Sequence, residues 1–303
     1  MRKVFIATSS FAKDDSRPIE ILRETGFEVY LNPHGRTLSE DEIRNYLIDK
    51  DFLIAGTEPL SRHVLESAKG LKIISRCGVG MDNVDMDAAG QLGIRVYNTP
   101  DGPTSAVAEL TVGLMLNLMR NVPLMDREVR SGIWKKRMGN LLNKKKVGII
   151  GFGKIGQKVA ELLFPFGCAL AYCDIRDLDS VFGIEKLESC ELLKHSDIVS
   201  IHVSSKRQII GEKEIKLMKK GAWLVNISRG GVVDEDALYI ALKEGHLSGA
   251  ALDVFGKEPY TGPLSELDNV ILTPHIGSYA KEARVEMEMQ AVENLLKGLE
   301  VML

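Results

Sequence analysis

A glycine-rich segment near the middle of the 303-residue chain carries the residue types that bind a dinucleotide. The apolar run 147–150, typical of a buried strand, leads directly into Gly151-Phe152-Gly153-Lys154-Ile155-Gly156, a G-x-G-x-x-G motif, and a helical pattern follows. The first glycine of such a turn permits a tight bend, the second lets a pyrophosphate approach, and the third lets helix and strand pack closely. Exposed N–H groups at the helix start then bind the anion. Because strand, motif and helix agree, we predict a dinucleotide site rather than an ordinary glycine turn.

Asp174 indicates which dinucleotide the site would take. It ends the next predicted strand and lies 18 residues after Gly156, close to the spacing of a carboxylate that accepts the ribose hydroxyls. A carboxylate at this position repels a 2′-phosphate, so the sequence predicts NAD as the cofactor. Arg176 could turn toward a phosphate, which leaves NADP as the alternative.

Polar residues also follow three later apolar strands, where open α/β sheets place their ligand crevice. They lie in the segments 224–234 with Arg229, 250–259 with Asp253 and Glu258, and 272–277 with His275. Each has a plain structural reading as well: a surface ion-pair arginine, a turn glutamate before proline, and a structural histidine.

Together with Arg76-Cys77-Gly78-Val79-Gly80 and Asn98-Thr99-Pro100, these segments resemble the signature of the D-isomer specific 2-hydroxyacid dehydrogenases, most closely the phosphoglycerate dehydrogenase branch. The resemblance covers essentially the whole chain. It implies that Arg229 binds the substrate carboxylate and keto oxygen, that His275 is the acid/base, and that Glu258 pairs with His275. The chemistry agrees, because hydride reduction of a ketone leaves an alkoxide that needs a proton donor active near neutral pH. A neighbouring carboxylate favours the charged imidazole, and a guanidinium offers a planar fork to a carboxylate.

The same resemblance implies further contacts with the cofactor. Lys154 and Ile155 would bind it within the glycine turn, and His202 would contact it from the end of another strand. Asp253 would accept a hydrogen bond from the nicotinamide carboxamide, although it could instead only cap its turn.

On the substrate side, the backbone around Val79 and Gly80 would contact the carboxylate, and Arg76 matches a position that often holds a phosphate. Ala55 stands where many phosphoglycerate dehydrogenases have an arginine. We therefore expect 3-phosphoglycerate and 3-phosphohydroxypyruvate as the best guess, with a glyoxylate or hydroxypyruvate reductase as the alternative. A non-catalytic NAD-responsive binding protein is the rival from another class, because corepressors of this fold exist.

Two series of alternating strands and helices must position these residues. Apolar strand patterns lie at 4–7, 27–30, 52–55, 72–75 and 94–97, and then near 147–150, 170–173, 198–201, 223–226, 249–252 and 270–272. Helices are expected at 104–119, which must be largely buried, at 123–134, and at 281–298. We predict an α/β protein with two doubly wound parallel-sheet domains. An NAD-binding Rossmann domain, 99–282, would be inserted into a flavodoxin-like substrate-binding domain of 1–98 and 283–303, with the active site in the cleft between them.

Composition and charge restrict the classes of partner and the cellular compartment that we expect for this protein. A formal net charge of −3 gives no positive field for nucleic acid, and the apolar stretch after Lys3 is too short for a signal peptide or a membrane span. The four cysteines and the histidines show no disulfide or metal spacing, which indicates a cytoplasmic protein without a metal. Cys77 is either an oxidation-sensitive thiol or a small buried residue. The buried 104–119 helix and the family resemblance favour a homodimer, and the chain length predicts the short form without a regulatory domain.

Overall fold

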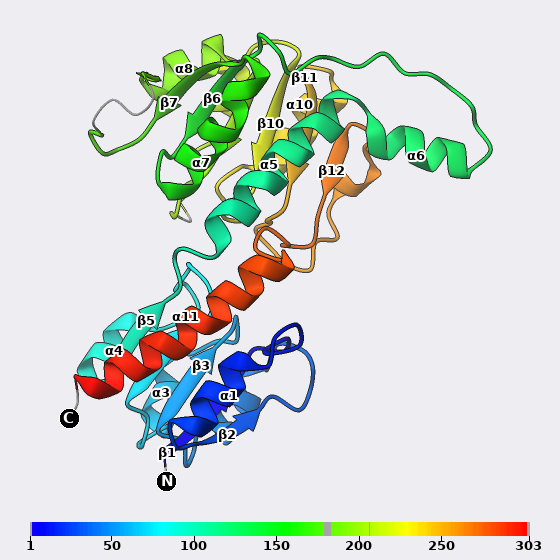
Figure 1. The fold of residues 1–303 in the computed structure, drawn as a ribbon. Helices are drawn as coiled ribbons and strands as arrows, with labels where there is room; N and C mark the ends of the chain where they lie inside the picture. Colours follow the sequence, from blue (N-terminus) through cyan, green and yellow to red (C-terminus); the bar gives the residue numbers. More distant parts are fainter. Residues whose placement is uncertain (1, 179–182, 206, 302–303) are drawn as a thin grey trace. The chain divides into compact units, whose positions relative to one another are not determined.

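The computed structural model describes residues 2–178, 183–205 and 207–301, and the chain divides into two compact units. The first unit is Met1–Pro103 with Ser278–Leu303, and the second is Thr104–Gly277. Each contains a parallel sheet flanked by helices, which confirms the predicted fold class (Figure 1). The domain boundaries expected from the sequence lie after residues 98 and 282. In the structure the two units meet after residues 103 and 277, five residues away in each case. The first unit extends further because Thr99 is fully buried in it and its hydroxyl accepts a hydrogen bond from the N–H of Gly78.

The first unit contains a five-stranded sheet in the order β2-β1-β3-β4-β5. Its strands are β1 (Arg2–Ile6), β2 (Phe27–Leu31), β3 (Phe52–Ala55), β4 (Ile73–Arg76) and β5 (Arg95–Asn98). Its helices are α1 (Arg17–Glu24), α2 (Glu40–Tyr46), α3 (Arg62–Ser67), α4 (Met86–Gln91) and α11 (Lys281–Glu300). This strand order is the flavodoxin-like one.

Helices cover both faces of this sheet because successive strand residues point to opposite sides. Phe5 and Leu53 belong to the hydrophobic cluster that includes residues of α2, α3 and α4. Ile6 and Ile54 belong to the cluster of α1 and α11, to which the C-terminal helix contributes Met287 among others. The last helix therefore completes a core that the first hundred residues begin.

The second unit contains a seven-stranded parallel sheet in the order β12-β11-β10-β9-β6-β7-β8. Its strands are β6 (Lys146–Ile150), β7 (Ala169–Cys173), β8 (Glu185–Lys186), β9 (Ile198–Ile201), β10 (Ala222–Asn226), β11 (Leu247–Leu252) and β12 (Val270–Leu272). Its α-helices are α5 (Pro103–Met119), α6 (Val122–Arg130), α7 (Lys154–Leu163), α8 (Ser189–His195), α9 (Glu212–Leu217) and α10 (Glu235–Lys243), and its two short 3-10 helices are η1 (Phe164–Phe166) and η2 (Pro263–Glu266). The order of the strands in this Rossmann-type sheet reverses between β6 and β9, the point at which doubly wound sheets bind their ligand.

Two layers of helices also enclose the second sheet. One hydrophobic cluster joins α5 and α7 to one face, and another joins α8, α9 and α10 to the other face. The buried helix α5 packs on its own sheet, with Val107, Met115 and Leu118 buried there.

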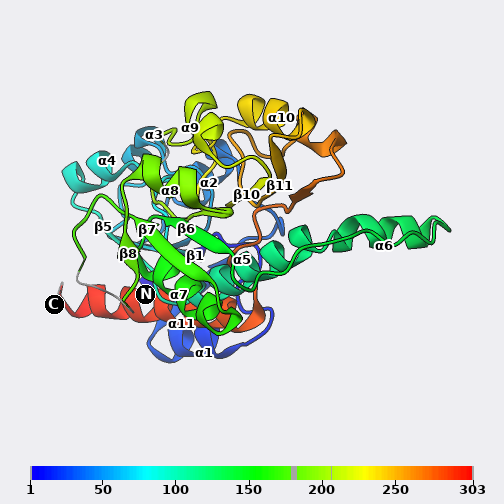
Figure 2. The same cartoon turned by 90° about the horizontal axis from the view of Figure 1, so that it is seen from above.

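A segment of 121–141, which we call the arm, departs from this layered packing (Figure 2). It comprises α6 and the chain that follows it, and no residue of α6 is buried. Several large apolar side chains of the arm are exposed: Val122, Val129, Ile133, Trp134, Met138 and Leu141. Among the described residues, no helix combines the length and apolar composition needed to cross a lipid bilayer.

Candidate active site

The glycine turn after β6 has the geometry that its motif predicts. Gly151 has a φ of 88°, and a Cβ there would lie 2.5 Å from the carbonyl oxygen of His202. A Cβ at Gly156 would lie 2.2 Å from the carbonyl oxygen of Gly151, so helix α7 and the turn touch through this glycine. Among the described residues, a Cβ at Gly153, which caps α7, would meet only the Arg176 guanidinium, at 3.6 Å. The turn is thus tightly packed at Gly151 and Gly156 and open at Gly153.

Asp174 is anchored to the glycine turn by the backbone. Its Oδ2 accepts a hydrogen bond of 2.7 Å from the N–H of Phe152, and its Oδ1 accepts one of 2.9 Å from the N–H of Arg176. The Arg176 side chain also pairs with both carboxylate oxygens. Burial by itself would raise the pKa of Asp174, but these hydrogen bonds lower it to about 2. The Asp174 carboxylate is therefore ionised near neutral pH, directly beside the turn, with Arg176 as its counter-ion.

His202 follows β9, on the other side of the strand-order reversal. Its backbone N–H donates to the Ile150 carbonyl at 2.7 Å, and its Nε2 lies 2.8 Å from the Ser200 hydroxyl. Its Nδ1 is shielded from solvent and has no hydrogen-bond partner among the described residues. Burial lowers the pKa of His202 to about 4, so the ring is neutral at pH 7. A neutral imidazole with one unpartnered nitrogen is suited to a hydrogen bond with a bound molecule.

These features fit a dinucleotide. The turn offers a glycine cradle that a Cβ would fill, an anionic acceptor beside it, and the N–H groups of the first residues of α7. Lys154, exposed, and Ile155, half-buried, are the first two residues of that helix. The predicted cofactor residues of the turn thus lie around one helix start.

The side chains of Glu258 and His275 contact each other in the second unit. The His275 Nδ1 lies 2.9 Å from the Glu258 Oε2, and both side chains are partly exposed. The other oxygen of Glu258 accepts a 3.1 Å hydrogen bond from the N–H of Phe255, which fixes the carboxylate. With Nδ1 directed at the carboxylate, the Nε2 of His275 is the nitrogen left for a substrate.

Asp253 holds the loop that carries His275. The buried carboxylate accepts from the Thr273 hydroxyl at 2.6 Å and from the backbone N–H groups of Ile276 and Gly277 at 2.8 Å. Burial raises the pKa of Asp253, and the hydrogen bonds oppose this shift. The loop needs the support because His275 has a φ of 55°, which is unfavourable for a residue with a side chain. Three donors leave about one acceptor position on Asp253 for a ligand.

Arg229 follows β10 in a turn that Asn226 organises. The Asn226 side chain donates to the Arg229 carbonyl at 3.1 Å and accepts from the N–H and the hydroxyl of Ser228. A Cβ at Gly230 would lie 1.8 Å from the carbonyl oxygen of Phe255, so this turn packs against the segment before Glu258. The Arg229 Nη1 donates to the Ser228 carbonyl at 2.7 Å.

The structure therefore brings the turns of Arg229, Glu258 and His275 to the same edge of one sheet. They follow β10, β11 and β12, which are paired in this order and run parallel. Sequence reasoning did not single out Asn226 or Thr273, whose side chains hold two of these turns. Both are polar residues at the ends of apolar strands, and this pattern could have identified them as part of the site.

The predicted substrate residues Arg76, Val79 and Gly80 belong to the first unit. Arg76 ends β4, and its Nη1 donates to the carbonyl of the next residue at 2.9 Å. A Cβ at Gly78, whose φ is 143°, would overlap that guanidinium. The Val79 carbonyl accepts a 2.8 Å hydrogen bond from the side chain of Asn98. These contacts shape a glycine-rich turn at the carboxyl edge of the first sheet.

The structure favours a packing role for Cys77. It is buried, and burial raises the pKa of its thiol to about 11, so the reactive thiolate is scarce near neutral pH. Among the described residues, no group of three or more His, Cys, Asp or Glu side chains is placed to hold a metal ion.

Comparison with known proteins agrees with the geometry. Residues 112–277 match the family model described as "D-isomer specific 2-hydroxyacid dehydrogenase, NAD binding domain". The chain is 42% identical, over 93% of its length, to a D-3-phosphoglycerate dehydrogenase of Methanocaldococcus jannaschii, of which it covers 55%. It is 43% identical, over 79% of its length, to a glyoxylate reductase of Thermococcus litoralis, of which it covers 77%. The chain thus spans about half the length of the first of these relatives.

A solved structure with the same architecture comes from Thermus thermophilus. It superposes with a TM-score of 0.91 at 37% sequence identity, and the alignment covers 98% of this chain and 97% of that chain. Both units therefore have counterparts in that structure.

Proposed function

The chain belongs to the D-isomer specific 2-hydroxyacid dehydrogenase family, and from this premise we propose that it is an NAD-dependent oxidoreductase acting on a small 2-keto or 2-hydroxy carboxylate. The observation that carries the proposal is the 2.9 Å contact of His275 with Glu258, in the same unit as the glycine cradle and Asp174. The second unit would be the NAD-binding domain and the first the substrate-binding domain.

Each of the proposed catalytic residues has a separate role in the reaction. When bound, NADH supplies the hydride. The Arg229 guanidinium binds the substrate carboxylate through its planar fork and orients the keto group. His275, protonated, donates from Nε2 to the substrate oxygen as that oxygen gains charge, and Glu258 stabilises the imidazolium and holds its orientation. In the oxidative direction the same nitrogen accepts the proton.

Cofactor binding relies on the turn and two acidic residues. The N–H groups at the start of α7, with Lys154 and Ile155, bind the pyrophosphate, and Asp174 accepts the ribose hydroxyls. His202 contacts the cofactor from the end of β9. Asp253 uses its remaining acceptor position for the nicotinamide carboxamide.

The first substrate pair to test is 3-phosphoglycerate and 3-phosphohydroxypyruvate, with Arg76 on the phosphate and the backbone of Val79 and Gly80 on the carboxylate. One observation favours the second candidate, a glyoxylate or hydroxypyruvate reductase. The Glu58 side chain is buried in the same unit, and the N–H of Gly56 is shared between its two carboxyl oxygens. Burial raises the pKa of Glu58, while its electrostatic interaction with Arg76 opposes this shift. A carboxyl group that interacts with Arg76 competes with a substrate phosphate for the guanidinium.

An NADH oxidation assay with a panel of 2-keto acids tests the activity. We expect turnover by the wild type, a kcat at least about a hundredfold lower for His275→Ala, and mainly a lower kcat/KM for Arg229→Ala. His195→Ala is the matched control, because the exposed side chain of His195 forms a comparable pair with Glu191 on α8. NADH binding without turnover of any keto acid would instead identify a non-catalytic binding protein. The ranking of kcat/KM across the panel separates the two substrate candidates.

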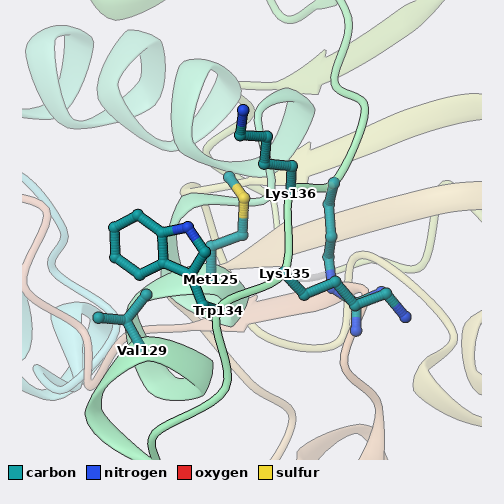
Figure 3. Close-up of a pocket in the computed structure, with 6 residues that line it drawn as sticks. Met125, Val129, Trp134, Lys135 and Lys136 are labelled. Atoms are coloured by element: carbon teal, nitrogen blue, oxygen red, sulfur yellow. The ribbon is translucent and has the colours of Figure 1, made fainter.

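We also propose that the protein is a homodimer and that the arm forms the interface. Trp134 and Met138 are 84% and 94% exposed, and large apolar side chains gathered on one segment are typical of a protein–protein contact. A pocket in the arm is lined by Met125, Val129, Trp134, Lys135, Lys136 and Arg137 (Figure 3). The buried helix α5 needs no partner, since its own sheet covers it. The arm is therefore the better support for a dimer.

All four cysteines are free. Unpaired thiols are typical of a reducing compartment, and we propose that the protein functions in the cytoplasm.

A further inference from the structure

A buried serine on β9 contacts the histidine that follows this strand. The Ser200 hydroxyl lies 2.8 Å from the Nε2 of His202, and Ser200 is fully buried. The two residues are two positions apart in extended backbone, so their side chains project from the same face of the sheet. Ile198, two positions before Ser200, belongs to the hydrophobic cluster of α5 and α7 on that face. The pair therefore lies on the face that carries α7, the helix that starts at the glycine turn.

The hydrogen-bonding capacity of the two side chains determines which nitrogen of His202 carries the proton. Burial lowers the pKa of His202 to about 4, so at pH 7 the ring has one N–H and one acceptor nitrogen. Among the residues that the structure describes, the Ser200 hydroxyl bonds to His202 alone. If this hydroxyl accepted, its own O–H would be a buried donor without an acceptor, which is less favourable than an unused lone pair. The hydroxyl therefore donates to Nε2.

Donation by Ser200 leaves the proton of the neutral ring on Nδ1. This nitrogen is shielded from solvent and has no hydrogen-bond partner in the described part of the chain. A buried N–H without an acceptor is unfavourable, so the ring is suited to an acceptor that a ligand brings. The glycine turn is adjacent, because a Cβ at Gly151 would lie 2.5 Å from the His202 carbonyl oxygen. A dinucleotide bound at that turn would bring the oxygens of its diphosphate and riboses.

We propose that Ser200 is a positioning residue for the cofactor, which holds His202 in the Nδ1–H tautomer and so makes it a hydrogen-bond donor to a dinucleotide oxygen. Without the serine hydroxyl the proton can move to Nε2, and the lone pair of Nδ1 would then face the ligand oxygen. Two acceptors repel each other, so this tautomer binds the dinucleotide less tightly. Ser200 acts through the histidine rather than by touching the cofactor. This inference rests on the proposed dinucleotide site and deepens it.

The first test determines the tautomer of His202 in the protein without ligand. Nitrogen-15 NMR distinguishes a protonated from an unprotonated imidazole nitrogen by chemical shift, and the His202→Asn spectrum identifies the His202 signals among those of the six histidines. In the wild type at pH 7 we expect a protonated Nδ1 and an unprotonated Nε2. In Ser200→Ala we expect the proton to be shared between the two nitrogens. A wild-type ring protonated at Nε2 would overturn the proposal.

The second test measures equilibrium binding of NADH by its fluorescence, and of ADP-ribose by displacement of NADH, with no substrate present. For Ser200→Ala we expect the Kd of both ligands to rise about three- to tenfold, because a hydrogen bond to the diphosphate or ribose is weakened. Ser200→Thr keeps the hydroxyl, so its Kd should stay within about twofold of the wild-type value. Weaker binding of NADH with unchanged binding of ADP-ribose would contradict the assigned acceptor.

Ser196→Ala is the matched control, because Ser196 is a buried serine just before β9 whose hydroxyl donates to the Leu192 carbonyl at 2.6 Å. It should leave both dissociation constants unchanged. In a His202→Asn background, Ser200→Ala should have no further effect on NADH binding, since the serine acts through the ring. Equal losses in the two backgrounds, or equal losses for the two serine variants, would reduce Ser200 to a structural role.

The two tests separate this inference from the proposed function on which it rests. A wild type that binds neither NADH nor ADP-ribose would end the proposed cofactor site and this inference with it. Intact binding by a wild type with the opposite tautomer would end this inference alone. Neither readout depends on turnover, so both are independent of dehydrogenase activity.

Discussion

His202 links the cofactor site to the pH dependence of stability. Its folded pKa of about 4 is below the ordinary value of 6.5 because the ring is buried. Its contribution to stability is therefore complete above pH 6.5 and is lost as the pH falls from 6.5 toward 4, where the unfolded chain binds the proton more readily.

We expect His202 to account for a loss of about 2 kcal/mol in the free energy of unfolding between pH 7 and pH 5. His202→Asn should lack this part of the pH dependence. Urea unfolding followed by the fluorescence of Trp134 and Trp223, which both lie in the second unit, measures it. An identical pH dependence in wild type and variant would contradict the burial argument.

At the scale of single residues, the family motifs predicted the contact between Glu258 and His275 but not the residues that hold their turns. The Glu258 and His275 contact follows from two motifs that end adjacent strands. The role of Asp253 could not be settled the same way, because its donors lie at least 20 residues later in the chain. They reach Asp253 only through the register of β11 with β12. A sequence pattern does not specify that register.

At the scale of helix and strand, substitutions of two glycines in the turn between β6 and α7 should separate an effect on stability from an effect on NADH binding. In Gly156→Ala the new Cβ would lie 2.2 Å from the Gly151 carbonyl oxygen, so α7 must shift. We expect a loss of about 1–3 kcal/mol in stability together with loss of NADH binding. Thermal denaturation and a fluorescence titration measure the two effects.

Gly153→Ala is the matched variant. Its Cβ would meet only the Arg176 guanidinium among the described residues, and the φ of −73° suits alanine. Stability should stay within about 0.5 kcal/mol of the wild type, while NADH binding weakens about tenfold or more because the methyl group blocks the pyrophosphate. Wild-type affinity in this variant would show that no pyrophosphate passes over the turn.

Among the elements, strongly patterned strands were predicted well and weakly patterned ones were not. The predicted strand 52–55 corresponds to β3 (Phe52–Ala55), whose four residues are all buried. Strand β8 was missed, because Glu185 and Lys186 are exposed and polar and carry no apolar pattern, although their backbone pairs with β7. Helix α6 ends at Arg130 rather than at the predicted residue 134, since Gly132 adopts a φ of 81° just beyond it.

At the scale of the whole molecule, the proposed interface on the arm predicts that the protein is a dimer in solution. The proposed dimer should sediment at twice the chain mass of 33.5 kDa. Replacing two buried apolar anchors of an interface typically costs about 2 kcal/mol or more each, so a Trp134→Ser, Met138→Ser double variant should be monomeric at micromolar concentration. Sedimentation velocity measures this.

Phe164→Ser is the control, because Phe164 is a similarly exposed aromatic of the same unit outside the arm. It should remain dimeric. A monomeric wild type, or a double variant that stays dimeric, would rule out the arm as the interface.

The order in which the chain emerges during synthesis has a consequence for its folding. The apolar face formed by Val4, Ile6 and Ile54 is covered in part by Met287 and Leu295, which are translated nearly three hundred residues after the first strand. The second unit, Thr104–Gly277, ends ten residues before Met287, so nearly all of it emerges while this face is still uncovered. It can fold while the earlier strands still lack a cover, and an uncovered apolar sheet face attracts other chains. The first unit, whose strands are made before the second unit, is thus completed after it, and the vulnerable interval closes only when helix α11 is made.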